Sequence, residues 1–215
     1  MPASAELMRR LGYDRYGAHG NDAGANVSPA LGRIAPENVI GVHVTQIFAF
    51  PSGDPSELES LSDADMQKLQ FLQSFDEEMS AFARLQATKP KNLAHALADS
   101  PSGQLAWSGQ LFGDAVDPDH ILTNVAIYWL TNTGASGRLY YEDWHAEHPT
   151  EPTTFPMGLA SFAYDFRPIR RLAERDHRNI VSWSEFDRGS HWATYDAPDL
   201  LIGDLRKFFS MVGSG

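Results

Sequence analysis

The chain contains no cysteine among its 215 residues, which excludes disulfides and thiolate chemistry and fits a reducing compartment. It also lacks any run of about 18 apolar residues that could span a membrane, and its first residues, Met1–Ser4, do not begin a signal peptide. Positive charge is scarce, because 17 Lys and Arg against 28 Asp and Glu leave a net charge of −11. That balance disfavours binding to nucleic acid or to anionic membranes. These absences together predict a soluble, cytoplasmic protein.

The composition is otherwise that of a globular protein, with 42% hydrophobic and 11% aromatic residues. Short apolar runs typical of strands alternate with longer segments typical of helices, which predicts an α/β fold with a mostly parallel sheet. The predicted strands are 16–19, 39–44, 159–162 and 180–183, and the predicted helices are 1–12, 63–75, 77–85, 93–97, 167–178 and 198–211. The last helix carries one apolar stripe, and Asp196 is its expected N-cap.

The segment Gly20-Asn21-Asp22-Ala23-Gly24 lies between a strand-like run and a stretch of small residues. In a nucleophile elbow the reactive residue occupies a sharp strand-to-helix turn, and glycines two residues before and after it relieve the crowding. An aspartate there cannot perform serine chemistry, but its carboxylate can attack an electrophilic carbon and form an alkyl ester. Because the same pattern also occurs in plain surface turns, the interpretation depends on the other site residues.

A histidine and a carboxylate complete this pattern. His191 lies in a Gly/Ser loop just after the run 180–183, and Asp165 follows the run 159–162. The two are separated by roughly one helix and one strand, the spacing of side chains at the ends of adjacent parallel strands. The chain order nucleophile, acid, histidine is that of α/β-hydrolases. Glu174 and Asp176 are rival carboxylates, but they lie on a charged helix typical of a solvated face.

Five parts of the chain carry a resemblance to a known family. They are Gly20–Ala25, Leu85–Pro90, Ala98–Trp107, Arg138–Glu142, and Gly189–Ala193 with Pro198–Leu201 after it. In these segments the chain resembles the C-terminal part of an epoxide hydrolase of the microsomal and juvenile-hormone type, which has the α/β-hydrolase fold with a helical lid. The resemblance implies that a small apolar epoxide and water form a vicinal diol through an aspartyl alkyl ester, without a cofactor or a metal. A haloalkane dehalogenase, which shares the aspartate chemistry, and an inactive truncated fragment are the alternatives.

The same resemblance assigns roles to individual residues. Asp22 is the nucleophile, His191 the base and Asp165 the acid that orients the base. The backbone N–H of Ala23 is one donor of the oxyanion hole. Tyr140 donates a proton to the epoxide oxygen, and the adjacent Tyr141 is its rival, because neighbours on a helix point about 100° apart and only one can face the pocket.

Three departures from the family pattern matter. Phe82 stands where the family usually has a second tyrosine, and Ala23 stands where a tryptophan is common. Nothing in the chain matches the family's N-terminal segment and first strands, which hold the second oxyanion donor. We therefore expect residues 1–51 and 136–215 to form a hydrolase core without its first strands, and residues 52–135 to form the lid. The open sheet edge predicts a homodimer or a complementary N-terminal fragment as partner.

Overall fold

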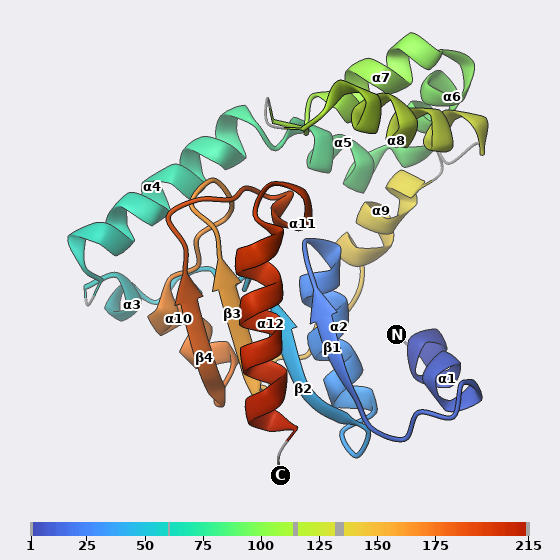
Figure 1. Ribbon diagram of the computed structural model, residues 1–215. Helices are drawn as coiled ribbons and strands as arrows, with labels where there is room; N and C mark the ends of the chain where they lie inside the picture. Colours follow the sequence, from blue (N-terminus) through green and yellow to red (C-terminus); the bar gives the residue numbers. More distant parts are fainter. Residues whose placement is uncertain (1, 60, 114–115, 132–135, 214–215) are drawn as a thin grey trace. The chain divides into compact units, whose positions relative to one another are not determined.

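The computed structural model describes residues 2–59, 61–113, 116–131 and 136–213 (Figure 1). The chain divides into two compact units. The first, which we call the sheet unit, comprises Met1–Lys68 and Thr150–Gly215, and the second, the helical unit, comprises Leu69–Pro149. In the described part of the chain, no helix is long and apolar enough to cross a membrane.

The sheet unit is built on four parallel strands in the order β1-β2-β3-β4. Their bounds are β1 (Tyr16–Gly20), β2 (Val39–Val44), β3 (Met157–Ser161) and β4 (Ile180–Glu185). The four predicted strands are thus confirmed, to within a few residues at each end. The two central strands are the most deeply buried, and β3 is buried along its whole length. A parallel sheet needs such apolar central strands because helices cover both of its faces.

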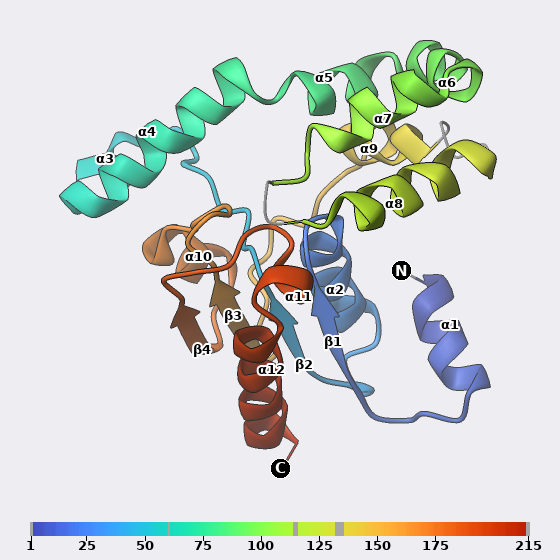
Figure 2. The ribbon, with the colours of Figure 1, turned by 45° about the horizontal axis from the view of Figure 1, so that its top comes forward.

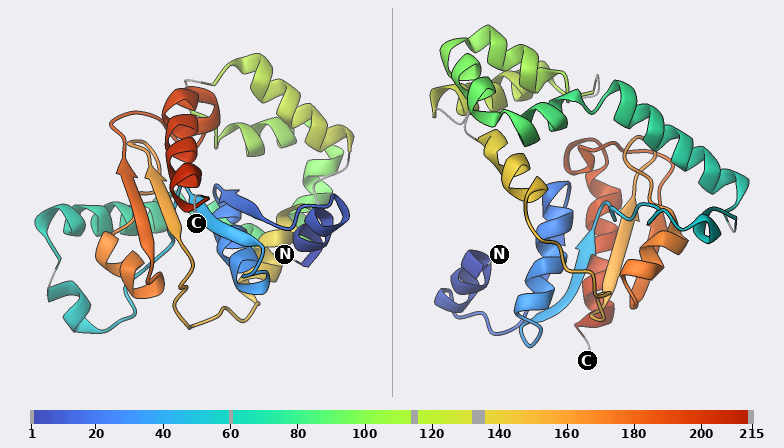
Figure 3. Two further views of the ribbon diagram at one scale, coloured as in Figure 1. Left: turned by 60° about the horizontal axis from the view of Figure 1, so that its bottom comes forward. Right: turned by 180° about the vertical axis from the view of Figure 1, so that it is seen from behind.

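Helices of the sheet unit lie on both faces of this sheet. The C-terminal helix α12 (Pro198–Val212) covers one face, and α2 (Ala23–Ile34) and α10 (Arg170–Asp176) lie on the other, as Figures 1 and 3 show. Phe208 of α12 is fully buried against the sheet, where its ring lies 5.5 Å from that of His43. This packing confirms the apolar stripe predicted for the last helix. The shorter helices of the unit are α1 (Pro2–Arg10), α3 (Pro55–Glu59) and α11 (Ala193–Asp196).

The expected N-cap of α12 is wrong. Ala197 is the N-cap and makes no side-chain capping bond, because Pro198 occupies the first helical position and fixes the start of the helix there. Asp196 instead ends α11, and its carboxylate accepts the backbone N–H of Ser190 at 3.1 Å. The aspartate therefore stabilises the loop that carries His191 rather than the end of a helix.

The described part of the helical unit is made of helices (Figure 2). The helix α4 (Asp63–Glu78) starts in the sheet unit, and it is followed by α5 (Ala81–Thr88), α6 (Pro90–Asp99), α7 (Pro101–Gly109), α8 (Pro118–Leu130) and α9 (Arg138–Trp144). Three of them begin at a proline, which suits the first helical position because that residue needs no N–H. The predicted helix 77–85 is wrong, because the chain turns at Met79 and Ser80 between α4 and α5.

The compact units divide the chain later than the predicted boundaries at 51/52 and 135/136. The break falls after Lys68, whose ammonium group donates to the carbonyl oxygen of Pro168 and lies 3.5 Å from Glu185, both in the sheet unit. The helix α9, expected in the hydrolase core, packs on α5 and α6 and so belongs to the helical unit.

Candidate active site

The predicted site residues of the sheet unit follow the carboxyl ends of its strands. Asp22 comes after β1, Asp165 after β3 and His191 after β4. Because the strands are parallel, as the arrows in Figure 1 show, these ends lie along one edge of the sheet. Polar side chains from several loops can therefore meet there.

Asp22 occupies a strained strand-to-helix turn. It has φ 53° and ψ −123°, and it is the one non-glycine residue with positive φ in the described part of the chain. Such a conformation costs about 1–3 kcal/mol and is found where function requires a side chain to be presented sharply. The turn places the carboxylate in front of α2, where Oδ1 accepts the backbone N–H of Ala23 at 2.6 Å.

The two glycines of the elbow are not equivalent. A Cβ on Gly20 would overlap the backbone carbonyl group of Gly24 and lie 2.7 Å from the hydroxyl of Ser28. A Cβ on Gly24 would meet no atom within 4 Å. The expectation that both glycines relieve crowding is therefore confirmed for Gly20 and wrong for Gly24.

The structure brings Asp22, Asp165 and His191 together. His191 Nδ1 lies 3.1 Å from Asp165 Oδ1, and His191 Nε2 lies 3.4 Å from Asp22 Oδ2. Exposure of the side chains rises along this series, from 8% for Asp165 through 34% for His191 to 54% for Asp22. The innermost group can thus orient the imidazole, while the outermost carboxylate remains open to a substrate.

Backbone contacts between the loops after β3 and β4 hold Asp165 and His191 at this distance. Tyr164 N–H donates to the carbonyl oxygen of Gly189 at 3.0 Å, which continues the pairing of the two strands. Gly189 has φ 89°, and a Cβ there would lie 2.5 Å from the ring of Phe162. Glycine is needed at this position for both reasons.

The electrostatic surroundings of His191 favour its protonated form. Burial of the imidazole lowers its pKa, but the hydrogen bond to Asp165 and the negative charges of Asp165 and Asp22 outweigh this effect. The pKa of His191 is therefore raised above its ordinary value. A raised pKa makes the neutral imidazole a stronger base.

The rival carboxylates have other partners. Glu174 accepts from Arg170 at 2.8 Å on the exposed side of α10, and Asp176 accepts from Arg175 at 2.7 Å. Of the three candidates for the orienting acid, it is thus Asp165 that lies beside His191.

Three polar residues of the site were not identified from the sequence. Asn21, Thr45 and Gln46 form hydrogen bonds among the loops after β1, β2 and β3. Thr45 and Gln46 are almost fully buried although both are polar. The signal that could have revealed them is their position directly after the apolar strand β2, at the edge where Asp22 and Asp165 also lie.

Tyr140 and Tyr141 belong to the helical unit. The ring of Tyr140 lies edge-on to that of Phe82, with centroids 6.3 Å apart. The ring of Tyr141 instead lies 4.2 Å from that of His145. The residue that departs from the family pattern, Phe82, is therefore a direct neighbour of Tyr140.

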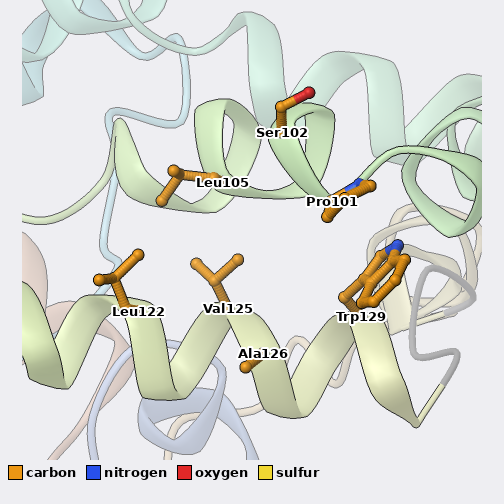
Figure 4. A pocket seen from close by; sticks show the side chains of 7 residues that line it. All are labelled: Pro101, Ser102, Leu105, Leu122, Val125, Ala126 and Trp129. Carbon is orange, nitrogen blue, oxygen red and sulfur yellow. The ribbon is translucent and has the colours of Figure 1, made fainter.

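The helical unit also contains an apolar groove between α7 and α8, with a volume of about 290 Å³ (Figure 4). Side chains of the two helices face each other across it, as the figure shows. The lining residues are Pro101, Ser102, Leu105, Leu122, Val125, Ala126 and Trp129. None of the predicted catalytic residues lines this groove.

Comparison with known proteins shows which proteins the chain is similar to. No protein-family model matches the chain. A Stigmatella aurantiaca protein named "Putative epoxide hydrolase" is 37% identical over 219 residues, which are 96% of this chain and 49% of that protein. Juvenile hormone epoxide hydrolase 2 of Ctenocephalides felis is 28% identical, over 93% of this chain and 50% of its own. The chain thus spans about half the length of the curated relatives it matches.

The fold agrees with this similarity. An enantioselective mutant of the Aspergillus niger epoxide hydrolase superposes with a TM-score of 0.87 at 26% identity, over 98% of this chain and 56% of that structure. By sequence and by fold, the chain is thus similar to the C-terminal part of epoxide hydrolases of the microsomal and juvenile-hormone type, and it shares their α/β-hydrolase fold.

Proposed function

We propose that the protein hydrolyses an epoxide to a vicinal diol through an ester on Asp22. The observation that carries this proposal is the set of contacts from Asp165 to His191 and from His191 to Asp22. An aspartate at a strained elbow can attack carbon, and a histidine beside it can activate the water that cleaves the resulting ester.

The hydrogen bonds at Asp22 suggest which carboxylate oxygen does which task. Oδ1 is held by the N–H of Ala23, so Oδ2 is the oxygen available to attack the epoxide carbon. After attack, Oδ1 becomes the carbonyl oxygen of the ester. When water adds to that ester, negative charge develops on Oδ1, where the Ala23 N–H can stabilise it.

The second step needs a base. His191, oriented by Asp165 through Nδ1, takes a proton from water at Nε2, and the hydroxide attacks the ester carbonyl carbon of Asp22. The diol leaves, the carboxylate is regenerated, and the proton on His191 passes through water to the phenolate of Tyr140, so that all three groups are restored. In the first step we assign to Tyr140 the hydrogen bond to the epoxide oxygen and the proton for the alkoxide. With Phe82 as its neighbour, Tyr140 acts without a second phenol from that position.

A single-turnover experiment in heavy-oxygen water tests the mechanism. The purified chain, in excess, is mixed with a styrene-oxide-type epoxide, and the diol and the peptide containing Asp22 are analysed by mass spectrometry. We expect heavy oxygen in Asp22 and diol as product. The Asp22→Asn variant should form no ester, and Asp14→Asn, an exposed change before β1, should behave as the parent.

Three outcomes would count against the proposal. Diol formed by the Asp22→Asn variant would remove Asp22 from its role. Label found directly in the diol would indicate attack by water without an ester. Halide release from an alkyl halide, without diol from the epoxide, would point to dehalogenase chemistry instead.

The role of the two units and the partner are proposed on the same basis. The sheet unit serves as the hydrolase core and the helical unit as the lid.

Within the described residues β1 pairs with β2 alone, which leaves its other edge unpaired. We propose that this edge pairs with a second copy of the chain or with a complementary N-terminal fragment, because open parallel edges associate readily. Light scattering coupled to size-exclusion chromatography distinguishes a dimer from a monomer. A cytoplasmic location is part of the proposal and rests on the absence of cysteine.

A further inference from the structure

Gln46 forms hydrogen bonds to both carboxylate-bearing loops of the site. Its Oε1 accepts the backbone N–H of Asp22 at 2.8 Å. Its Nε2 donates to Asp165 Oδ2 and, at 2.7 Å, to Asn21 Oδ1. Its Oε1 also accepts the hydroxyl of Thr45 at 2.9 Å. The side chain is 1% exposed, so these bonds together satisfy a buried amide.

The orientation of this amide follows from its partners. A backbone N–H can only donate, so the atom facing Asp22 N must be the amide oxygen. An ionised carboxylate can only accept, so the atom facing Asp165 must be the amide nitrogen. In the reversed orientation the amide NH2 group would face the N–H of Asp22, and the amide oxygen would face the carboxylate of Asp165. Neither pair could form a hydrogen bond. Gln46 therefore has one orientation that suits the site.

The contacts on Asp165 divide its two oxygens between two partners. Oδ1 lies 3.1 Å from His191 Nδ1, and Oδ2 accepts from Gln46 Nε2. A carboxylate held at both oxygens cannot rotate away from the imidazole. Asn21 adds a link from the other direction, because its Nδ2 donates to the carbonyl oxygen of His191 at 2.9 Å. The amides thus connect the loops of all three predicted catalytic residues.

We propose that Gln46 is a positioning residue of this site, which holds the Asp165 carboxylate toward His191 and fixes it relative to the backbone of Asp22. The proposal rests on the proposed function, because it assigns to His191 the task of a base. Gln46 acts through Asp165 and does not touch the reacting atoms. Its loss should therefore slow the hydrolysis of the ester more than the formation of the ester.

The first test requires no substrate. The pKa of His191 is measured by NMR titration of its ring protons in the folded chain and in Gln46→Met, a change that keeps the volume and removes the amide. Since the hydrogen bond to Asp165 raises the pKa of His191, loosening Asp165 should lower that pKa toward the ordinary value of histidine. Thr153→Val, which removes a buried hydroxyl bonded to His177 in the same unit, should leave it unchanged. An unchanged or higher pKa in folded Gln46→Met overturns the proposal.

A double-mutant cycle separates positioning from a general structural effect. In an Asp165→Asn background, Gln46→Met should change the pKa of His191 no further, because its route of action is gone. An equal fall in both backgrounds refutes the proposed route. Should Gln46→Met fail to fold, Gln46→Asn keeps the amide but shortens its reach by one methylene, and the same fall is expected.

The second test uses single turnover of an epoxide. We expect Gln46→Met to form the ester at nearly the parental rate and to hydrolyse it about 10–100-fold more slowly, so that the ester accumulates. Equal slowing of both steps overturns the proposal. Because the titration needs no turnover, a chain that hydrolyses no epoxide contradicts the proposed function, while the positioning role of Gln46 is still decided by the pKa of His191.

Discussion

The asymmetry of the two elbow glycines gives a sharp prediction about stability. In Gly20→Ala, the new Cβ would overlap the backbone carbonyl group of Gly24, whereas ordinary contacts lie at 3.4–4 Å. Backbone cannot rotate away as a side chain can, so β1 and the start of α2 must separate. We expect Gly20→Ala to lower the free energy of unfolding by about 3 kcal/mol or more. Gly24→Ala meets open space and adds a better helix former, so it should raise stability by at most about 1 kcal/mol.

Urea denaturation followed by circular dichroism measures both variants under the same conditions. Both replace a glycine by alanine within the same five-residue segment, so effects on the unfolded chain largely cancel in the comparison. The Gly20→Ala variant should also fail to form an ester, because moving Gly24 displaces the neighbouring N–H of Ala23. Equal denaturation midpoints for the two variants would refute the steric reasoning and the geometry of the elbow with it.

Three further predictions follow from the same geometry. Asp22→Gly should be more stable than Asp22→Ala by about 1–2 kcal/mol, because glycine adopts φ 53° without strain; equal stabilities, measured by denaturation, would show that the turn is unstrained. Asp165→Asn should lower the pKa of His191, which Asp165 raises, and slow ester hydrolysis on the order of 10³–10⁴-fold; a parental NMR titration and hydrolysis rate would exclude Asp165 as the orienting acid. Burial lowers the pKa of His177 to about 4 from its ordinary value of about 6.5. Above pH 6.5 the histidine is neutral in both the folded and the unfolded chain, whereas at lower pH the unfolded chain binds its proton first. Up to about 3 kcal/mol of the free energy of unfolding is therefore lost as the pH falls from about 6.5 to about 4. His177→Gln should weaken this acid dependence in thermal unfolding, and an identical pH dependence in both proteins contradicts the assignment.

Much of the sheet unit could be predicted from the sequence because its signals are local. The strand β2 has the predicted bounds, since a short run rich in branched apolar residues suits a strand covered on both faces. The meeting of Asp22, Asp165 and His191 could also be predicted, because each follows a strand and parallel strands end at one edge. Only the order of strands and their direction were needed for that step.

The parts that could not be predicted depend on which partner a polar side chain meets in the folded chain. Gln46 and Asp165 are 119 residues apart, and an uncharged amide after a strand gives no sign of which loop it will meet. The N-cap of α12 was assigned to Asp196, which is a good N-cap by type, yet its carboxylate bonds to Ser190 in the His191 loop. In both cases a polar side chain has several possible partners nearby in sequence, and tertiary packing selects among them.

The charges around His191 also link its pKa to the chemical state of Asp22. Asp165 Oδ1 accepts a hydrogen bond from His191 Nδ1, so Nδ1 carries a proton. His191 Nε2 is therefore the nitrogen that gains or loses a proton. In the resting site Nε2 faces the carboxylate of Asp22 at 3.4 Å, and that charge helps to raise the pKa of His191.

In the proposed mechanism, ester formation turns Asp22 into a neutral group. The pKa of His191 then falls, which favours the neutral imidazole that the second step needs. Ester hydrolysis should therefore begin at a lower pH than the resting pKa of His191 would suggest, and pre-steady-state rates measured across pH check this relation. A hydrolysis rate that rises only at the resting pKa would show that the charge of Asp22 has no influence on the base.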